Sequence, residues 1–199
     1  MRTALQPYGR IMSPEPTTVA VVVVAGGRSR RFGRDKLAVD VHGHRLLDGS
    51  LEVARALTAE VLVVGPPRDD LPPGVLQVQE EPAYSGPYAA VAAALPLVEG
   101  DVVVVLAGDL LAPGPLLPLL LEALAEHPEA DAAVTVDAEG RRQPLLAAFR
   151  TPALRAGVAG VDPQDRGAYT LLDGLHVVEV HDPASWSKDV DVPTDLPPL

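Results

Sequence analysis

The stretch "VVVVAGGRSRRFGRDK", Val21 to Lys36, decides the fold expected for this sequence. It begins as a run of valines, which is typical of a strand buried on both faces of a parallel sheet. It continues as a glycine-containing loop with five cationic side chains between Arg28 and Lys36. Glycines let the backbone approach a ligand closely, and successive amides can bind an anion, so the loop predicts a phosphate site. A solvated basic turn is the plainer alternative.

The loop differs from two common phosphate-binding motifs. No Gly-Lys-Ser/Thr follows Gly33, and the glycine spacing is not that of the dinucleotide-binding G-x-G-x-x-G. Lys36 stands out, because only two of the 16 Lys and Arg residues in the chain are lysines. A lysine brings a compact point charge to a phosphate oxygen, which makes Lys36 the first candidate for a phosphate ligand.

The rest of the chain alternates strand-like and helix-like segments. Strand-like apolar runs occur at 19–24, 61–64, 75–78, 102–106, 132–136, 145–149 and 177–180. Helix-like segments cover 46–57, 87–97 and 116–126. This alternation predicts βαβ units and a mainly parallel sheet. Ligands of such sheets bind beyond the carboxyl ends of the strands, where the glycine loop lies.

Length, charge and composition narrow the class of protein. A chain of 199 residues suits a single domain, which we expect over 19–199, with residues 1–18 as a mobile extension. The net charge of −11 argues against a nucleic-acid or membrane-surface binder. Asp109 and three prolines interrupt the apolar stretch 102–121, so we expect no membrane span and a cytoplasmic protein. The absence of cysteine excludes a thiolate nucleophile, whereas an oxygen-ligated metal remains possible.

The segment "VVAGGRSRRFGRDKLAV" resembles the signature loop of nucleotidyltransferases that share the molybdenum cofactor guanylyltransferase fold, L-A-G-G-x-S-x-R-M-G-x-D-K. The matching residues are Ala25, Gly26, Gly27, Ser29, Arg31, Gly33, Asp35 and Lys36. The resemblance extends over about 19–197 and implies a three-layer α/β/α, Rossmann-like nucleotidyltransferase domain with a mixed, mostly parallel sheet. It also implies that the loop wraps a triphosphate, while Arg31 and Lys36 neutralise charge as the α-phosphate is attacked.

Two further segments carry carboxylates at positions that the family uses. Asp109 follows a buried run in "VVVVLAGDLLAPG", and "KDVDVPTDL" resembles the family's closing motif D-x-D-T-P-E-D-L. The resemblance implies that Mg²⁺ is held by Asp109 and Asp191, with Asp189 as a positioning residue on the acceptor side. From the residues alone, a helix cap is an equally good interpretation of Asp109. An acidic turn that caps the last short helix is the alternative for the closing segment.

Three segments resemble parts of the family's base and acceptor sites. In "QEEPAYSGPYAAVAAAL", Gly86 matches, and Glu81 is favoured over Glu80 as the acidic residue that contacts guanine. A pair of solvated glutamates is the alternative. The resemblance also implies that two residues lie on the acceptor side, Gln143 in "RRQPLLAAFR" and Arg166 in "PQDRGAYTLLDGL".

The activity implied by the resemblance is Mg-dependent transfer of GMP from GTP to the phosphate of molybdopterin, with release of pyrophosphate. Cytidylyl transfer from CTP to the same acceptor, or guanylyl transfer to a small phosphorylated acid, would use the same loop. A nucleotide-binding regulator without catalytic activity and a metal-dependent glycosyltransferase are hypotheses from other classes. The sequence predicts neither the acceptor nor the oligomeric state.

Overall fold

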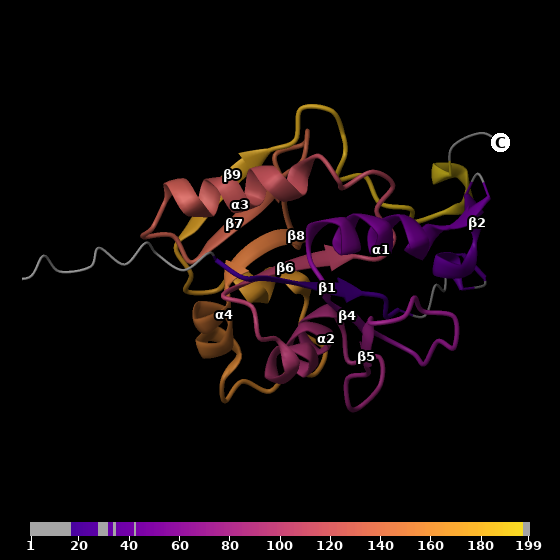
Figure 1. Ribbon diagram of the computed structural model, residues 1–199, viewed down its shortest axis with the longest axis horizontal. Coiled ribbons are helices and arrows are strands. Elements are labelled where there is room, and N and C mark those ends of the chain that lie inside the picture. The colour runs from indigo at the N-terminus through magenta and orange to yellow at the C-terminus, as the bar shows by residue number, and fades with distance from the viewer. Residues whose placement is uncertain (1–16, 28–31, 34, 42, 197–199) are drawn as a thin grey trace, which may run out of the picture.

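The computed structural model describes residues 17–27, 32, 33, 35–41 and 43–196. It shows a seven-stranded sheet between two layers of helices (Figure 1). The buried side chains of α1 (Leu46–Leu57) and α3 (Leu116–Glu126) pack on one face of the sheet. Those of α2 (Pro87–Ala94) and α4 (Thr151–Val158) pack on the other face. The predicted three-layer α/β/α fold is therefore confirmed.

The sheet is mixed, with the strand order β5-β4-β1-β6-β8-β7-β9. Its strands are β1 (Val19–Val24), β4 (Glu60–Val64), β5 (Leu76–Val78), β6 (Val102–Ala107), β7 (Ala132–Val136), β8 (Arg142–Arg150) and β9 (Val177–His181). Only β8 runs antiparallel to its neighbours, β6 and β7, and the other pairs are parallel. As a result, the first residues of β8 lie at the same edge of the sheet as the carboxyl ends of the other six strands.

The two valine runs form adjacent central strands, as their composition predicts. β1 and β6 pair in parallel, from Val19 with Val102 to Val24 with Ala107. Val21 and Val23 belong to the core under α1 and α3, whereas Ala20 and Val22 belong to the core under α2 and α4. Because alternate side chains enter opposite cores, both faces of the strand must be apolar, which explains an unbroken valine run.

Shorter elements complete the fold. The strands β2 (Asp40–Val41) and β3 (His44–Arg45) pair as a short antiparallel hairpin. The helix predicted over 87–97 is α2 followed by a 3₁₀ turn, η2 (Leu95–Leu97). Three more 3₁₀ turns are η1 (Lys36–Ala38), η3 (Ala168–Leu172) and η4 (Pro193–Asp195). Helix α4 was not predicted, because it is short and buries only Thr151 and Leu154.

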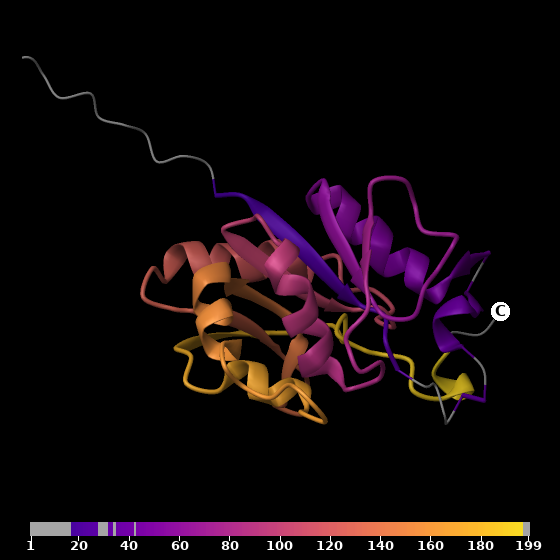
Figure 2. The same cartoon turned by 90° about the horizontal axis from the view of Figure 1, so that it is seen from below.

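The two ends of the described chain meet different parts of the domain. Thr18 donates its backbone N–H (2.9 Å) and its hydroxyl (2.8 Å) to Asp101, which ties the start of β1 to the start of β6. The mobile extension was expected over 1–18; residues 1–16 lie outside the described residues, whereas Thr18 is described and is bound to Asp101. At the other end, the segment leading to η4 lies beside η1 and the β2–β3 hairpin in both views (Figure 1, Figure 2). Among the described residues, no helix has the length and apolar character needed to cross a bilayer.

Helix α3 offers a matched pair of substitutions that tests the packing. Leu120 is fully buried against the sheet, whereas the adjacent Leu119 is 39% exposed. Leu120→Ala should lower the free energy of unfolding by about 2–5 kcal/mol, because it leaves a cavity in a close-packed core. Leu119→Ala should change it by less than about 0.5 kcal/mol. Urea unfolding followed by circular dichroism measures both, and equal effects would contradict the assigned faces of α3.

Candidate active site

Backbone hydrogen bonds bring the loops at the carboxyl edge of the sheet together. The N–H of Ala25 donates to the carbonyl of Val64 (2.7 Å), and the N–H of Gly108 donates to the carbonyl of Val24 (3.0 Å). The loop after β6 is in turn paired with the C-terminal segment, because Val190 N–H donates to the carbonyl of Asp109 (3.1 Å). The glycine loop therefore has fixed neighbours on both sides.

Gly65 permits a close approach between the loops after β1 and β4. A Cβ atom at this position would lie 2.6 Å from the carbonyl oxygen of Ala25 and 2.9 Å from the N of Gly26. Such contacts are too short for any side chain, and the obstacle is backbone rather than a flexible group. Glycine at position 65 is thus required by the way the start of the glycine loop packs on the loop after β4.

Lys36 lies within ion-pair distance of Asp109 and Asp191, two other predicted site residues. Asp35 starts η1 by accepting the N–H of Leu37 (3.0 Å), and Lys36 follows as the first residue of this turn. The Lys36 ammonium forms an ion pair with Asp109 and donates to the carbonyl of Val190 (2.9 Å). It also lies 3.9 Å from Asp191 Oδ1. The end of the glycine-loop motif, at Lys36, thus meets the motifs at 109 and 189–191.

The oxygen atoms around the Lys36 ammonium suit a divalent cation. Two carboxylates and a backbone carbonyl face one positive charge, and Mg²⁺ prefers oxygen ligands of this kind. Within the part of the chain that the structure describes, no group of three or more Asp, Glu, His or Cys side chains is arranged to hold a metal. Mg²⁺ commonly takes one or two protein carboxylates and completes its coordination with water and phosphate oxygens, so Asp109 and Asp191 fit such a site.

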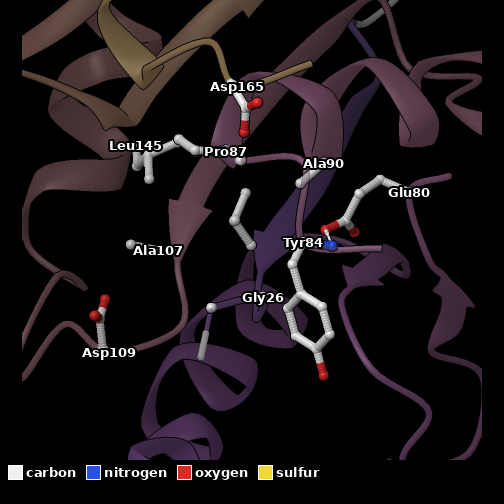
Figure 3. A pocket seen from close by; sticks show the side chains of 12 residues that line it. Gly26, Glu80, Tyr84, Pro87, Ala90, Ala107, Asp109, Leu145 and Asp165 are labelled. Carbon is white, nitrogen blue, oxygen red and sulfur yellow. Dashed lines mark hydrogen bonds between the residues drawn. The ribbon is translucent and has the colours of Figure 1, made fainter. Parts of the chain in front are cut away.

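The first of three cavities at this edge has a volume of 390 Å³ and lies between the glycine loop and α2 (Figure 3). Gly26 and Gly27 line it together with Gly86, the residue before α2. Figure 3 shows Glu80 and Asp109 on opposite sides of this cavity. A volume of this size is within the usual range for small-molecule sites.

Glu80, rather than the expected Glu81, lines the first cavity. Glu80 is 5% exposed, and its Oε1 accepts the N–H of Tyr84 (2.9 Å). Its Oε2 is buried, and no residue in the described ranges forms a hydrogen bond with it. Glu81 is exposed and is not among the lining residues. The two glutamates are adjacent in sequence, and only the direction of the chain after β5 distinguishes them.

The second cavity, of 480 Å³, lies on the other side of the glycine loop. Lys36 and Asp35 line it, together with Arg68 from the loop after β4. The Arg68 guanidinium donates to Asp35 Oδ2 (2.8 Å), and its side chain is only 10% exposed. Sequence reasoning missed Arg68, although the strand-end position of its loop is the signal that could have identified it.

The third cavity, of 390 Å³, is lined by Gln143 and Asp189, two of the residues expected on the acceptor side, and by Asp191, the expected metal ligand. Gln143, near the start of β8, donates to Asp137 Oδ2 (2.7 Å), so the antiparallel strand does bring it to this edge. Burial raises the pKa of Asp189 above its ordinary value, and the neighbouring carboxylates Asp109 and Asp191 raise it further. The third cavity therefore has a mainly acidic wall.

Arg166 is not part of the third cavity. Its Nε donates to the carbonyl of Asp162 (2.7 Å), and its guanidinium lies 5.8 Å from the centre of the Tyr88 ring, on the α2 side of the sheet. Its backbone packs against Gly86, where a Cβ atom would lie 3.0 Å from the Arg166 carbonyl oxygen. Ser29 and Arg31, the other predicted loop residues, lie outside the described residues.

The three-layer α/β/α fold, the glycine loop at the carboxyl edge of its sheet and the cluster of Lys36, Asp109 and Asp191, here named the Lys36 cluster, are typical of a nucleotidyltransferase. The family model "MobA-like NTP transferase domain" matches residues 21–180, and the chain belongs to this family. It is 32% identical over 195 residues to the "Probable molybdenum cofactor guanylyltransferase" of Chloroflexus aggregans, which covers 88% of this chain and 90% of the relative.

Solved structures show the same fold. The Rv0371c protein of Mycobacterium tuberculosis H37Rv has a TM-score of 0.70 at 23% identity, covering 90% of this chain and 95% of that one. The molybdopterin-guanine dinucleotide biosynthesis protein A of Archaeoglobus fulgidus has a TM-score of 0.66 at 24% identity, covering 89% of this chain and 94% of that one.

The close approach at Gly65 predicts opposite effects for two glycine-to-alanine substitutions. Gly65→Ala should destabilise the protein by about 1–3 kcal/mol, because the new methyl group displaces the backbone of Ala25 and Gly26. Gly49→Ala, inside α1 with open space around it, should stabilise it by about 0.5–1 kcal/mol. Thermal unfolding measures both variants. A neutral Gly65→Ala variant would contradict the tight contact between the loops after β1 and β4.

Proposed function

We propose that the protein transfers GMP from GTP to the phosphate of molybdopterin, releasing pyrophosphate. The observation that carries the proposal is the position of the Lys36 cluster. Asp109 lines the first cavity, Lys36 the second and Asp191 the third, so the cluster lies where all three meet. A transferase needs such a junction, because the α-phosphate must contact both the leaving pyrophosphate and the attacking acceptor. The printed name of the Chloroflexus aggregans relative supports the same reaction.

The glycine loop and Lys36 would bind the phosphates. Gly26 and Gly27 line both the first and the second cavity, so a nucleotide that lies along them can place its base in one and its phosphates in the other. Lys36 would then stabilise the negative charge that develops on the leaving pyrophosphate. Arg68 lines the same cavity and adds positive charge there, partly balanced by Asp35.

Asp109 and Asp191 would hold Mg²⁺, which screens the charge of the two polyanions and orients their oxygen atoms. The carboxylates themselves fix where the reacting phosphates meet, because each lines a different cavity. No side chain needs to form a covalent intermediate, since positioning and electrostatic stabilisation account for transfer of this kind.

Glu80 would select guanine. Its buried Oε2 lacks a hydrogen-bond partner among the described residues, and an unsatisfied buried carboxylate oxygen is costly unless a ligand supplies a donor. Guanine presents two donors, N1–H and the 2-amino group, whereas the corresponding edge of adenine offers no such pair. The acceptor would occupy the third cavity, with Gln143 and Asp189 in its wall.

Two variants test the transfer step. Lys36→Ala and Asp109→Ala should each retain the fold and lose about 100-fold or more in rate, because each removes a charge used in the transition state. The measurement is pyrophosphate release from GTP in the presence of Mg²⁺ and purified molybdopterin, with mass-spectrometric detection of the dinucleotide. Turnover near that of the wild type in either variant would contradict the mechanism. Nucleotide binding without pyrophosphate release by the wild type would instead favour a regulator.

A second pair of variants tests base selection. Glu80→Gln should reduce the preference for GTP over ATP by about 10-fold or more, because the amide turns one acceptor oxygen into a donor. The neighbouring Glu81→Gln is the matched control and should leave the preference unchanged, since its side chain is exposed. Competition between GTP, ATP and CTP in calorimetric titrations measures the preference. A larger effect of Glu81→Gln, or a wild-type preference for CTP, would contradict the assignment.

A further inference from the structure

The Lys36 ammonium lies at the place that the proposed function gives to the metal ion. Its ion pair with Asp109, its hydrogen bond to the Val190 carbonyl and its 3.9 Å approach to Asp191 use the oxygen atoms that would face Mg²⁺. Its side chain is 18% exposed and that of Asp109 is 17% exposed, so both charges are largely withdrawn from water. Two carboxylates without a cation would repel each other here, and the single charge of Lys36 offsets one of their two negative charges.

A lysine and a divalent metal ion cannot both occupy this position. A metal ion entering alone would have to displace the ammonium from Asp109 and leave it without that partner in a partly buried setting, which is unfavourable. A triphosphate removes this cost, because its oxygen atoms give the displaced ammonium new partners. Lys36 also lines the second cavity beside Gly26 and Gly27, so its flexible side chain has space on the phosphate side.

We propose that Lys36 occupies the cation position of the nucleotide-free enzyme, and that the metal ion therefore enters as its complex with the triphosphate. This inference rests on the proposed function, since it assumes the same metal site. It explains why a lysine stands here in a chain that otherwise uses arginine almost throughout. An ammonium group is compact enough to replace a metal ion among oxygen ligands, whereas a planar guanidinium is not.

Metal binding without nucleotide distinguishes a lysine that occupies the metal position from a lysine that only binds phosphate. Lys36→Met should bind Mn²⁺ in the absence of nucleotide about tenfold more tightly than the wild type, which is within the usual range of coupling between two ligands of one site. Removing a residue from the site would thus improve metal binding. The experiment titrates the full-length protein with Mn²⁺ and measures the free ion by electron paramagnetic resonance, so no catalytic activity is required.

Two controls identify the source of the effect. Lys188→Met removes the other lysine of the chain, which is exposed, lines the third cavity and does not take part in the ion pair with Asp109. This variant should change the Mn²⁺ affinity by less than about twofold. Combining Lys36→Met with Asp109→Asn should abolish the gain. Lys36→Gln is a second variant for the case that Lys36→Met does not fold, as judged by circular dichroism, and should also bind Mn²⁺ more tightly.

Unchanged or weaker Mn²⁺ binding in the folded Lys36 variant would overturn the inference, as would equal gains in the Lys36 and Lys188 variants. These outcomes are distinct from failure of the proposed function. If the wild type transfers GMP but the Lys36 variant shows no gain, the enzyme is a guanylyltransferase in which the metal binds independently. If the gain appears but no nucleotide is transferred, the cation exchange holds and the proposed reaction is wrong.

Discussion

The ion pair between Lys36 and Asp109 is the contact on which the arrangement of the site depends. It joins the loop after β1 to the loop after β6, and the carbonyl of Val190 adds the C-terminal segment to the same ammonium group. These three parts of the chain would otherwise present a basic loop and two acidic ones at the edge of the sheet. The attraction between Lys36 and the two carboxylates holds these three segments together, so the charged groups that nucleotide transfer needs lie close to one another.

The sheet determines which residues can reach this point. Parallel strands deliver the glycine loop, Glu80 and Asp109 to one edge, and antiparallel β8 brings Gln143 there from its beginning. The three cavities therefore lie side by side along one edge, with the Lys36 cluster where they meet. Close packing of the loops, as at Gly65, keeps this edge narrow enough for one substrate to contact several of them.

Much of the fold follows from the sequence, because an unbroken run of valines avoids water only in a strand that is buried on both faces of a sheet. The loop motif and the two acidic motifs also identified Lys36, Asp109 and Asp191, which the structure brings together. Finer choices depended on three-dimensional detail. Glu80 and Glu81 differ only in the direction that their side chains take after β5, and Arg68 is noticeable only once Asp35 is seen beside it. The backbone of Arg166, just before η3, packs against Gly86. Its side chain therefore lies near Tyr88 rather than in the third cavity.

The most direct test of the account is a crystal structure of the protein with Mn²⁺ and a GTP analogue whose α,β-bridging oxygen is replaced by a methylene group. Anomalous scattering would locate the metal ion independently of the protein coordinates. The account predicts the Mn²⁺ peak between Asp109 and Asp191, the Lys36 ammonium on a phosphate oxygen and guanine beside Glu80. A nucleotide bound with Lys36 still paired to Asp109, and with the metal ion away from both carboxylates, would contradict it.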